Sequence, residues 1–154
     1  MKNTRKNLCE NRKAFHDYFI LERIEAGLAL VGTEVKSIRM GKANMKDSFV
    51  FMKNSEAFVR GLHISPYDKG NLFNRDPLRI RKLLLHKREI ARLGKQTQQE
   101  GLTLIPIALY LKEGRVKLEV AVAKGKKLHD KRSSEAERDA KREMEKAIKQ
   151  RTPL

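Results

Sequence analysis

The sequence predicts a mainly β protein with a few peripheral helices, folded as a small antiparallel barrel and followed by a basic C-terminal tail. Residues 116–122 place Val, Leu, Val and Val in strict alternation with Lys, Glu and Ala, as in a strand that buries one face. Turn-forming residues divide much of the remaining chain into short strands joined as hairpins. From residue 124 to residue 154, charged side chains run almost without interruption.

The first third of the chain predicts a leader, a long strand and a short helix. Residues 1–10 are basic, have no apolar run and are expected to form a flexible leader. Residues 15–31 are rich in aromatic and aliphatic side chains and predict a strand, with a bend or bulge at Gly27. Residues 32–38 predict a short helix closed by Gly41.

The middle of the chain predicts a hairpin, a loop and a helix. Two apolar runs joined by a polar turn over residues 53–56 predict a hairpin that spans residues 49–59. Residues 65–77 are dense in turn formers and predict an exposed loop. Residues 80–99 predict an amphipathic helix that stops at Gly101.

A second hairpin completes the predicted barrel. Residues 102–111 form its first arm, residues 112–115 its turn and residues 116–122 its second arm, with Pro106 marking an edge or a bulge. About five strands with helices inserted late favour an oligonucleotide-binding type of barrel over a βαβ sheet. The predicted barrel domain covers residues 11–123.

Residues 124–154 predict a tail that is disordered when free. They carry eleven Lys and Arg against six Asp and Glu, and their apolar stripe is mostly alanine. Such a segment cannot offset the entropy of ordering, although the capping box over residues 134–137 favours a helix once a partner is bound. Basic tails usually become ordered against a polyanion.

The charge of the chain predicts a nucleic-acid-binding protein. The formal net charge is +16 and the sequence pI is about 10.2, as expected where cationic side chains displace counterions from phosphates. No apolar run reaches the length of a membrane span, and the basic N-terminus has no apolar core typical of a secretory signal. A single cysteine, Cys9, suits a reducing compartment, so we expect a cytoplasmic protein.

The sequence carries no specific motif for catalysis, a metal or a cofactor. The Gly-Lys pairs at Gly41 and Gly125 both fail the phosphate-loop pattern at their neighbouring positions. The four histidines lack metal-ligand spacing and cysteine partners. We therefore expect no enzyme, no metal and no cofactor. The alternative is an RNA-processing enzyme that uses His16 or His63 as general acid or base.

Contacts to nucleic acid have better support in the sequence. Seven cationic residues fall within 17 positions around the predicted helix, against one Glu, and predict a surface that follows phosphates: Arg79, Arg81, Lys82, Lys87, Arg88, Arg92 and Lys95. Several aromatic residues could stack on bases, although the core needs most of them, so we expect one or two at the interface: Phe15, Tyr18, Phe19, Phe49, Phe51, Phe58 and Tyr67.

With these residues in view, the chain resembles the SsrA-binding protein family, also called small protein B. Eight motifs occur in order and at matching spacing: residues 11–20, 25–28, 32–37, 41–44, 63–67, 81–87, 122–127 and 129–132. The resemblance implies a barrel that binds the tRNA-like domain of transfer-messenger RNA. It also implies delivery of that RNA, carried by elongation factor Tu, to stalled ribosomes for rescue by trans-translation, while the tail probes the decoding centre and the empty mRNA channel.

The resemblance also implies the residues that bind RNA. The family's positions fall on Asn11, Glu25, Leu84 and Lys117, to which the basic region adds Arg81, Lys82 and Lys87. Glu25 would either accept hydrogen bonds from base amino groups or 2′-hydroxyls, or hold neighbouring cations in place. The family's ribosome-engaging segment corresponds to a run at the start of the tail: Gly125, Lys126, His129, Asp130, Lys131 and Arg132.

Overall fold

The computed structural model describes residues 5–67, 74–99 and 101–126. The N-terminal part contains β1 (Arg5–Glu10), α1 (Arg12–Asp17), β2 (Tyr18–Leu28), α2 (Gly32–Arg39) and β3 (Ala43–Asn44). The remaining elements are β4 (Phe49–Lys53), β5 (Glu56–Arg60), β6 (His63–Ile64), β7 (Arg81–Leu84), α3 (Lys87–Thr97), β8 (Leu102–Lys112) and β9 (Arg115–Gly125). In these parts of the chain, none of the helices has the length and apolarity needed to cross a membrane.

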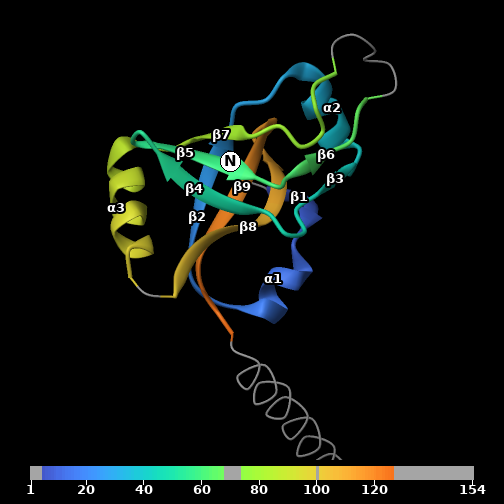
Figure 1. Cartoon of the computed structure of the whole chain (residues 1–154). Helices are drawn as coiled ribbons and strands as arrows, with labels where there is room; N and C mark the ends of the chain where they lie inside the picture. Colours follow the sequence, from blue (N-terminus) through green and yellow to red (C-terminus); the bar gives the residue numbers. More distant parts are fainter. Residues whose placement is uncertain (1–4, 68–73, 100, 127–154) are drawn as a thin grey trace, which may run out of the picture.

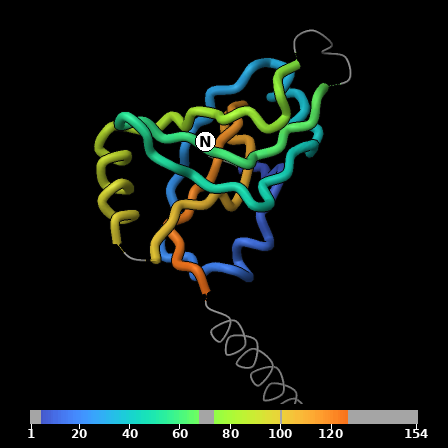
Figure 2. Tube along the Cα trace, viewed as in Figure 1, coloured from blue at the N-terminus to red at the C-terminus, as the bar shows by residue number. Residues whose placement is uncertain are grey.

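The main sheet is antiparallel and closes into a ring. Its strand order is β1-β8-β4-β5-β7-β2-β9, and β9 also pairs with β8 (Figure 1). Strand β8 therefore has β9 along one side, with β4 and then β1 along the other. The trace in Figure 2 shows the strands wound around a common interior, with α3 on one side of the ring.

The two predicted hairpins are confirmed as β4–β5 and β8–β9, and both have the type of tight turn that suits paired antiparallel strands. Asn54 and Ser55 both have positive φ, 52° and 61°, and so do Glu113 and Gly114, at 53° and 76°. Two consecutive residues with positive φ give a turn whose twist matches that of the flanking strands. The predicted irregularity at Pro106 is also confirmed, because the β8–β9 register shifts between Pro106 and Ala108.

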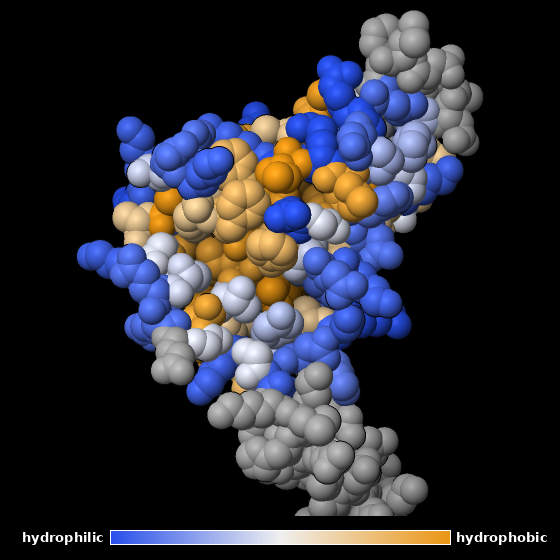
Figure 3. Space-filling model, in the orientation of Figure 1, coloured by the Kyte–Doolittle hydropathy of each residue, from blue (hydrophilic) through white to orange (hydrophobic). Residues whose placement is uncertain are grey.

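The main core lies inside the ring and is built from aliphatic side chains. Alternate residues of β9, including Leu118 and Val120, point inward and are fully buried, together with Leu83 of β7 and Leu109 of β8. A second, smaller cluster lies outside the ring, where Ala14 of α1 packs against β8 and β9. On the visible surface, hydrophilic residues lie around the periphery, while apolar side chains gather in the middle, over β4 and β5 (Figure 3).

Two predictions at the start of the chain are wrong. Residues 5–10 are not a flexible leader but form β1, which pairs with β8 through its backbone and packs Leu8 and Cys9 against the core. Residues 15–17 are not part of the long strand, because they belong to α1. The signal for α1 is its N-cap Asn11, whose side chain accepts from the backbone N–H of Ala14.

The predicted helix over residues 80–99 is wrong in its first part. Residues 81–84 form β7 between β5 and β2, and the helix begins only at Lys87. His86 has extended backbone angles, and its N–H donates to the Glu89 side chain at 2.9 Å, which caps α3. The alternation in β7 is only four residues long, so the helical pattern that follows it conceals the strand.

A buried ion pair connects β7 to α2. Arg81 is 0% exposed, and its Nε donates to Glu34 Oε2 at 2.8 Å while its Nη1 donates to the Leu62 carbonyl at 2.7 Å. Arg79 Nε donates to the same Glu34 oxygen at 3.0 Å. Burial acts to raise the pKa of Glu34, but the hydrogen bonds from Arg79, Val31 and Arg81 hold that pKa below its usual 4.5.

Replacing Glu34 with Gln should therefore destabilise the fold strongly. The change leaves the buried Arg81 cation without a counterion, which we expect to lower the free energy of unfolding by about 3–5 kcal/mol at pH 7. Because the folded pKa of Glu34 is lowered, its contribution is complete above pH 4.5 and is lost as the pH falls through the folded pKa. Urea titrations at several pH values should show the difference between the two proteins shrinking in acid.

The exposed pair between Lys13 and Asp47 provides the control. Lys13→Gln should leave the midpoint of unfolding almost unchanged. Equal stability of Glu34→Gln and the natural sequence would contradict the role of the buried pair.

Candidate nucleic-acid interface

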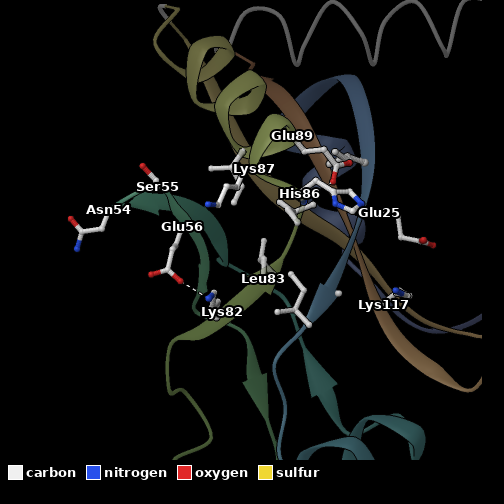
Figure 4. Close-up of a pocket in the computed structure, with 15 residues that line it drawn as sticks. Glu25, Asn54, Ser55, Glu56, Lys82, Leu83, His86, Lys87, Glu89 and Lys117 are labelled. Carbon is white, nitrogen blue, oxygen red and sulfur yellow. Dashed lines mark hydrogen bonds and ion pairs between the residues drawn. The ribbon is translucent and has the colours of Figure 1, made fainter.

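An open groove of about 930 Å³ lies where β2, β7 and β9 meet the β4–β5 turn and the start of α3 (Figure 4). We call it the β2–β7 groove. It brings together five of the seven residues predicted to bind RNA: Glu25, Leu84, Lys117, Lys82 and Lys87. Three of the five are cations, and they come from three different elements. The groove is therefore a charged concave surface that the chain builds from distant segments, and its lining also holds three glutamates, Glu25, Glu56 and Glu89.

Leu84 is an exposed apolar side chain within this groove. It is 54% exposed and lies opposite Gly27 in the β2–β7 pairing. A Cβ atom at Gly27 would come 3.1 Å from the Leu84 Cβ, so only glycine lets the Leu84 side chain lie this close to β2. The glycine predicted as a bend or bulge in β2 instead provides this close approach.

The carboxylate of Glu25 is oriented by neighbours on β8. The Tyr110 hydroxyl donates to Glu25 Oε1 at 2.6 Å, and Lys112 Nζ lies 3.4 Å from the same oxygen. The Tyr110 bond is the main reason that the pKa of Glu25 lies below its usual 4.5, and Lys112 and Lys117 act in the same direction. Glu25 is thus a fixed, ionised acceptor in a groove that also holds three lysines.

Arg5 of β1 extends this network around Tyr110. Its guanidinium lies 3.8 Å from the centroid of the Tyr110 ring and donates to Glu119 Oε2 at 3.0 Å and Oε1 at 3.3 Å. Glu119 is directly opposite Glu25 in the β2–β9 pairing, so Arg5 neutralises the second of two adjacent carboxylates. Neither Arg5 nor Tyr110 could be predicted from the sequence, because no local pattern places residues 5 and 110 beside residue 25.

The structure separates Asn11 and Arg81 from the groove. Asn11 is buried, and its Nδ2 donates to the Pro106 carbonyl at 2.9 Å, so it holds the start of α1 against β8. The prediction that Arg81 reaches RNA phosphates is wrong, because its guanidinium is inside the protein and bound to Glu34.

The other predicted cations of this region do not all lie in one helix, since only Lys87, Arg88, Arg92 and Lys95 belong to α3. Arg79 is bound to Glu34 ahead of β7, Lys82 pairs with Glu56 across the sheet, and Arg92 of α3 pairs with Glu22 of β2. Burial of Arg81 and the strand at β7 therefore break up the predicted phosphate-following surface, and of its seven cations only Lys82 and Lys87 line the groove.

The first two residues of the predicted tail segment belong to the described body. Strand β9 continues through Gly125, which pairs with Tyr18, so the body extends beyond the predicted end at residue 123. The Lys126 N–H donates to the Asp17 carbonyl at 2.8 Å, and its ammonium lies 4.9 Å from the centroid of the Phe19 ring. The other predicted tail residues lie outside the described residues: His129, Asp130, Lys131 and Arg132.

The histidines of the alternative hypothesis do not meet at the groove. His16 is in α1 with its Nδ1 3.0 Å from Asp17 Oδ1, whereas His63 is in β6. Of the histidines within the described residues, only His86 is among those that line the groove. Within residues 5–67, 74–99 and 101–126, no group of three or more His, Cys, Asp or Glu could hold a metal ion.

Comparison with known proteins gives a consistent family. A sequence profile described as "SmpB protein" matches residues 8–150. An SsrA-binding protein of Clostridium kluyveri is 63% identical over 150 residues, covering 97% of this chain and 96% of the relative. An SsrA-binding protein of Clostridium botulinum is 62% identical over 151 residues, covering 98% and 97%.

A solved structure described as "tmRNA-SmpB: a journey to the center of the bacterial ribosome" is also similar to this chain. It matches with a TM-score of 0.67 and 50% sequence identity, over 78% of this chain and 85% of that one.

Tyr110→Phe should release the Glu25 carboxylate while keeping the ring under Arg5. Loss of the hydroxyl donor should raise the pKa of Glu25 toward its usual 4.5, because that bond is the main cause of the lowering. Carboxyl-carbon NMR titration of Glu25 measures this directly. Tyr67→Phe is the matched control, since Tyr67 contacts Lys36 of α2 instead. An identical Glu25 titration in the Tyr110 variant and the natural sequence would exclude Tyr110 as its positioning group.

Proposed function

Because the chain belongs to the SmpB protein family, we propose that it binds transfer-messenger RNA and brings it to stalled ribosomes for rescue by trans-translation. The observation that carries this proposal is the β2–β7 groove, which gathers Glu25, Leu84 and Lys117 with two further lysines. The printed descriptions of the relatives name the SsrA RNA, tmRNA and the bacterial ribosome. The protein then works in the cytoplasm, where ribosomes are found.

The groove has the chemistry needed for a folded RNA. The ammonium groups of Lys82, Lys87 and Lys117 attract phosphates, which supplies affinity without sequence preference. The fixed carboxylate of Glu25 accepts hydrogen bonds from amino groups or 2′-hydroxyls, which supplies selectivity. Leu84 offers an apolar contact to a base or a ribose. Shape and a few directed contacts suit the tRNA-like domain better than a single strand read base by base.

The ring of strands supports a barrel of the oligonucleotide-binding type as the scaffold of this site. In such barrels one sheet face and the adjoining loops contact nucleic acid. Here the groove lies on the outer surface at the junction of β2, β7 and the β4–β5 turn, as that architecture requires. Asn11 contributes as the cap that fixes α1 to β8, and not through direct contact.

The tail engages the ribosome while the body holds the RNA. The matching family segment begins at Gly125 and Lys126, which end the described body, and continues through His129, Asp130, Lys131 and Arg132 into the decoding centre and the empty mRNA channel. His129 is suited to stack on an exposed rRNA base, and Lys131 and Arg132 are suited to reach phosphates. Elongation factor Tu joins the complex through the alanine-charged RNA.

The protein acts as an adaptor that binds RNA without cutting it. The competing hypothesis of an RNA-processing enzyme needs two groups that can exchange protons beside a bound RNA. His16 and His63 belong to different elements and do not line the groove. Incubation of the protein with labelled transfer-messenger RNA should give a bound complex and intact RNA, whereas cleavage fragments would favour the enzyme.

Leu84→Ala should weaken binding to the tRNA-like domain about tenfold, or about 1.4 kcal/mol, through loss of its apolar contact. Folding should be unaffected, because the side chain is 54% exposed. Leu78→Ala is the matched control, since Leu78 is 55% exposed but does not line the groove. Filter-binding or gel-shift titration gives both affinities. Equal affinity for the two variants would remove the β2–β7 groove from the RNA site.

Truncation after Lys126 should separate RNA binding from ribosome rescue. The shortened protein keeps the groove and the contacts of Lys126 with Asp17 and Phe19, so its affinity for transfer-messenger RNA should stay within a few-fold. Transfer of the peptide tag on stalled ribosomes should be lost. A hundredfold loss of RNA affinity, about 2.7 kcal/mol, or normal tagging by the shortened protein would contradict this division.

A further inference from the structure

The outer surface of β4 and β5 carries three phenylalanines that the core does not use. Phe51 and Phe58 face each other across the two strands with ring centroids 5.6 Å apart and planes 26° apart. Phe49 lies beside Phe51 at 6.3 Å with a tilt of 51°, and it is 41% exposed. With Arg60 and Lys82, these three residues form what we call the phenylalanine face.

The alternation of the strands explains why the rings point outward. Val50 of β4 and Ala57 and Val59 of β5 turn into the core, so the residues between them face the solvent. Among the residues that the structure describes, no phenylalanine is buried, although phenylalanine is one of the residue types most often found inside proteins. Figure 3 shows the resulting apolar area over β4 and β5.

Cations flank these rings in the sheet register. Arg60 lies directly opposite Phe49, and Lys82 of β7 lies directly opposite Phe58. Lys53 follows at the end of β4, and Glu56, which pairs with Lys82, is the acidic residue on this part of the sheet. Aromatic rings set between cations on a sheet are the combination that binds single-stranded nucleic acid, since rings stack on bases and cations neutralise phosphates.

We propose that the phenylalanine face binds unpaired nucleotides of RNA, with bases stacked on Phe49 and on the Phe51–Phe58 pair and phosphates held by Arg60 and Lys82. Lys82 and Glu56 also line the β2–β7 groove, so the two surfaces are continuous. An RNA strand that leaves a folded region in the groove can pass directly onto the rings. Only the identity of that RNA rests on the proposed function.

The exposed rings favour unpaired RNA over a duplex as the ligand. Bases inside a duplex are already stacked on each other and offer no face to such rings, whereas unpaired bases do. A protein partner would also suit the apolar area. Its binding, however, does not require the two cations that lie opposite the rings, Arg60 and Lys82.

A variant with a single tryptophan tests the stacking directly. The chain has no tryptophan, so Phe49→Trp introduces one fluorophore on the face. Titration of the full-length variant with a short single-stranded RNA should quench its emission in a saturable manner, and a duplex of the same length should quench it much less. Met40→Trp, at a 57% exposed position after α2, should show no saturable quenching. No quenching at position 49, or equal quenching at both positions, overturns the proposal.

Conservative variants complete the test. Phe49→Leu keeps an apolar side chain but removes the ring, so affinity for the single strand should fall about fivefold or more, and Phe49→Tyr should restore it. If the natural protein binds transfer-messenger RNA, but Phe49→Leu keeps full affinity and the emission of Phe49→Trp does not change, the phenylalanine face fails and the proposed function stands. If the emission of Phe49→Trp is quenched but transfer-messenger RNA does not bind, the proposed function fails alone.

Discussion

The buried ion pair between Glu34 and Arg81 determines which side chains of β7 reach the surface. A strand turns successive residues to opposite sides, so a shift of one residue would exchange its two faces. An Arg81 held inside by Glu34 and the Leu62 carbonyl forces Lys82 and Leu84 outward. Lys82 then lies beside Phe58, and Leu84 lies over Gly27 in the groove. A charge pair that costs desolvation energy therefore specifies the register on which the outer surface depends.

The acidic residues of this basic protein act as directed acceptors. Glu25 and Glu119 face each other across β2 and β9, an arrangement that is unfavourable without compensation. Tyr110, Lys112 and Arg5 supply that compensation and fix the direction of both carboxylates. A net charge of +16 attracts any polyanion, whereas a carboxylate held in one place rejects a phosphate and accepts only a donor.

Patterns in the sequence correctly predicted the elements that depend on contacts between residues close together in the chain. Both hairpins followed from alternation and turn residues, and α2 from its apolar spacing. Strand β1 was missed because its partner β8 lies about a hundred residues away and its own apolar content is small. Strand β7 was mistaken for helix because pairing with β5 and β2 overrides the helical pattern next to it. Of the groove residues, Glu25, Leu84 and Lys117 were predicted from family resemblance and Lys82 and Lys87 from the basic run, while Tyr110 and Arg5 needed the three-dimensional structure.

Strand β9 runs without interruption from Lys117 in the groove to Gly125, where the Lys126 N–H is bound to the Asp17 carbonyl. Eight residue steps of an extended strand cover about 26 Å. Pairing with β2 and β8 on its two sides prevents this strand from bending or sliding. The distance between Lys117 and Gly125 is therefore fixed. A partner bound in the groove consequently determines the position at which the chain continues beyond β9.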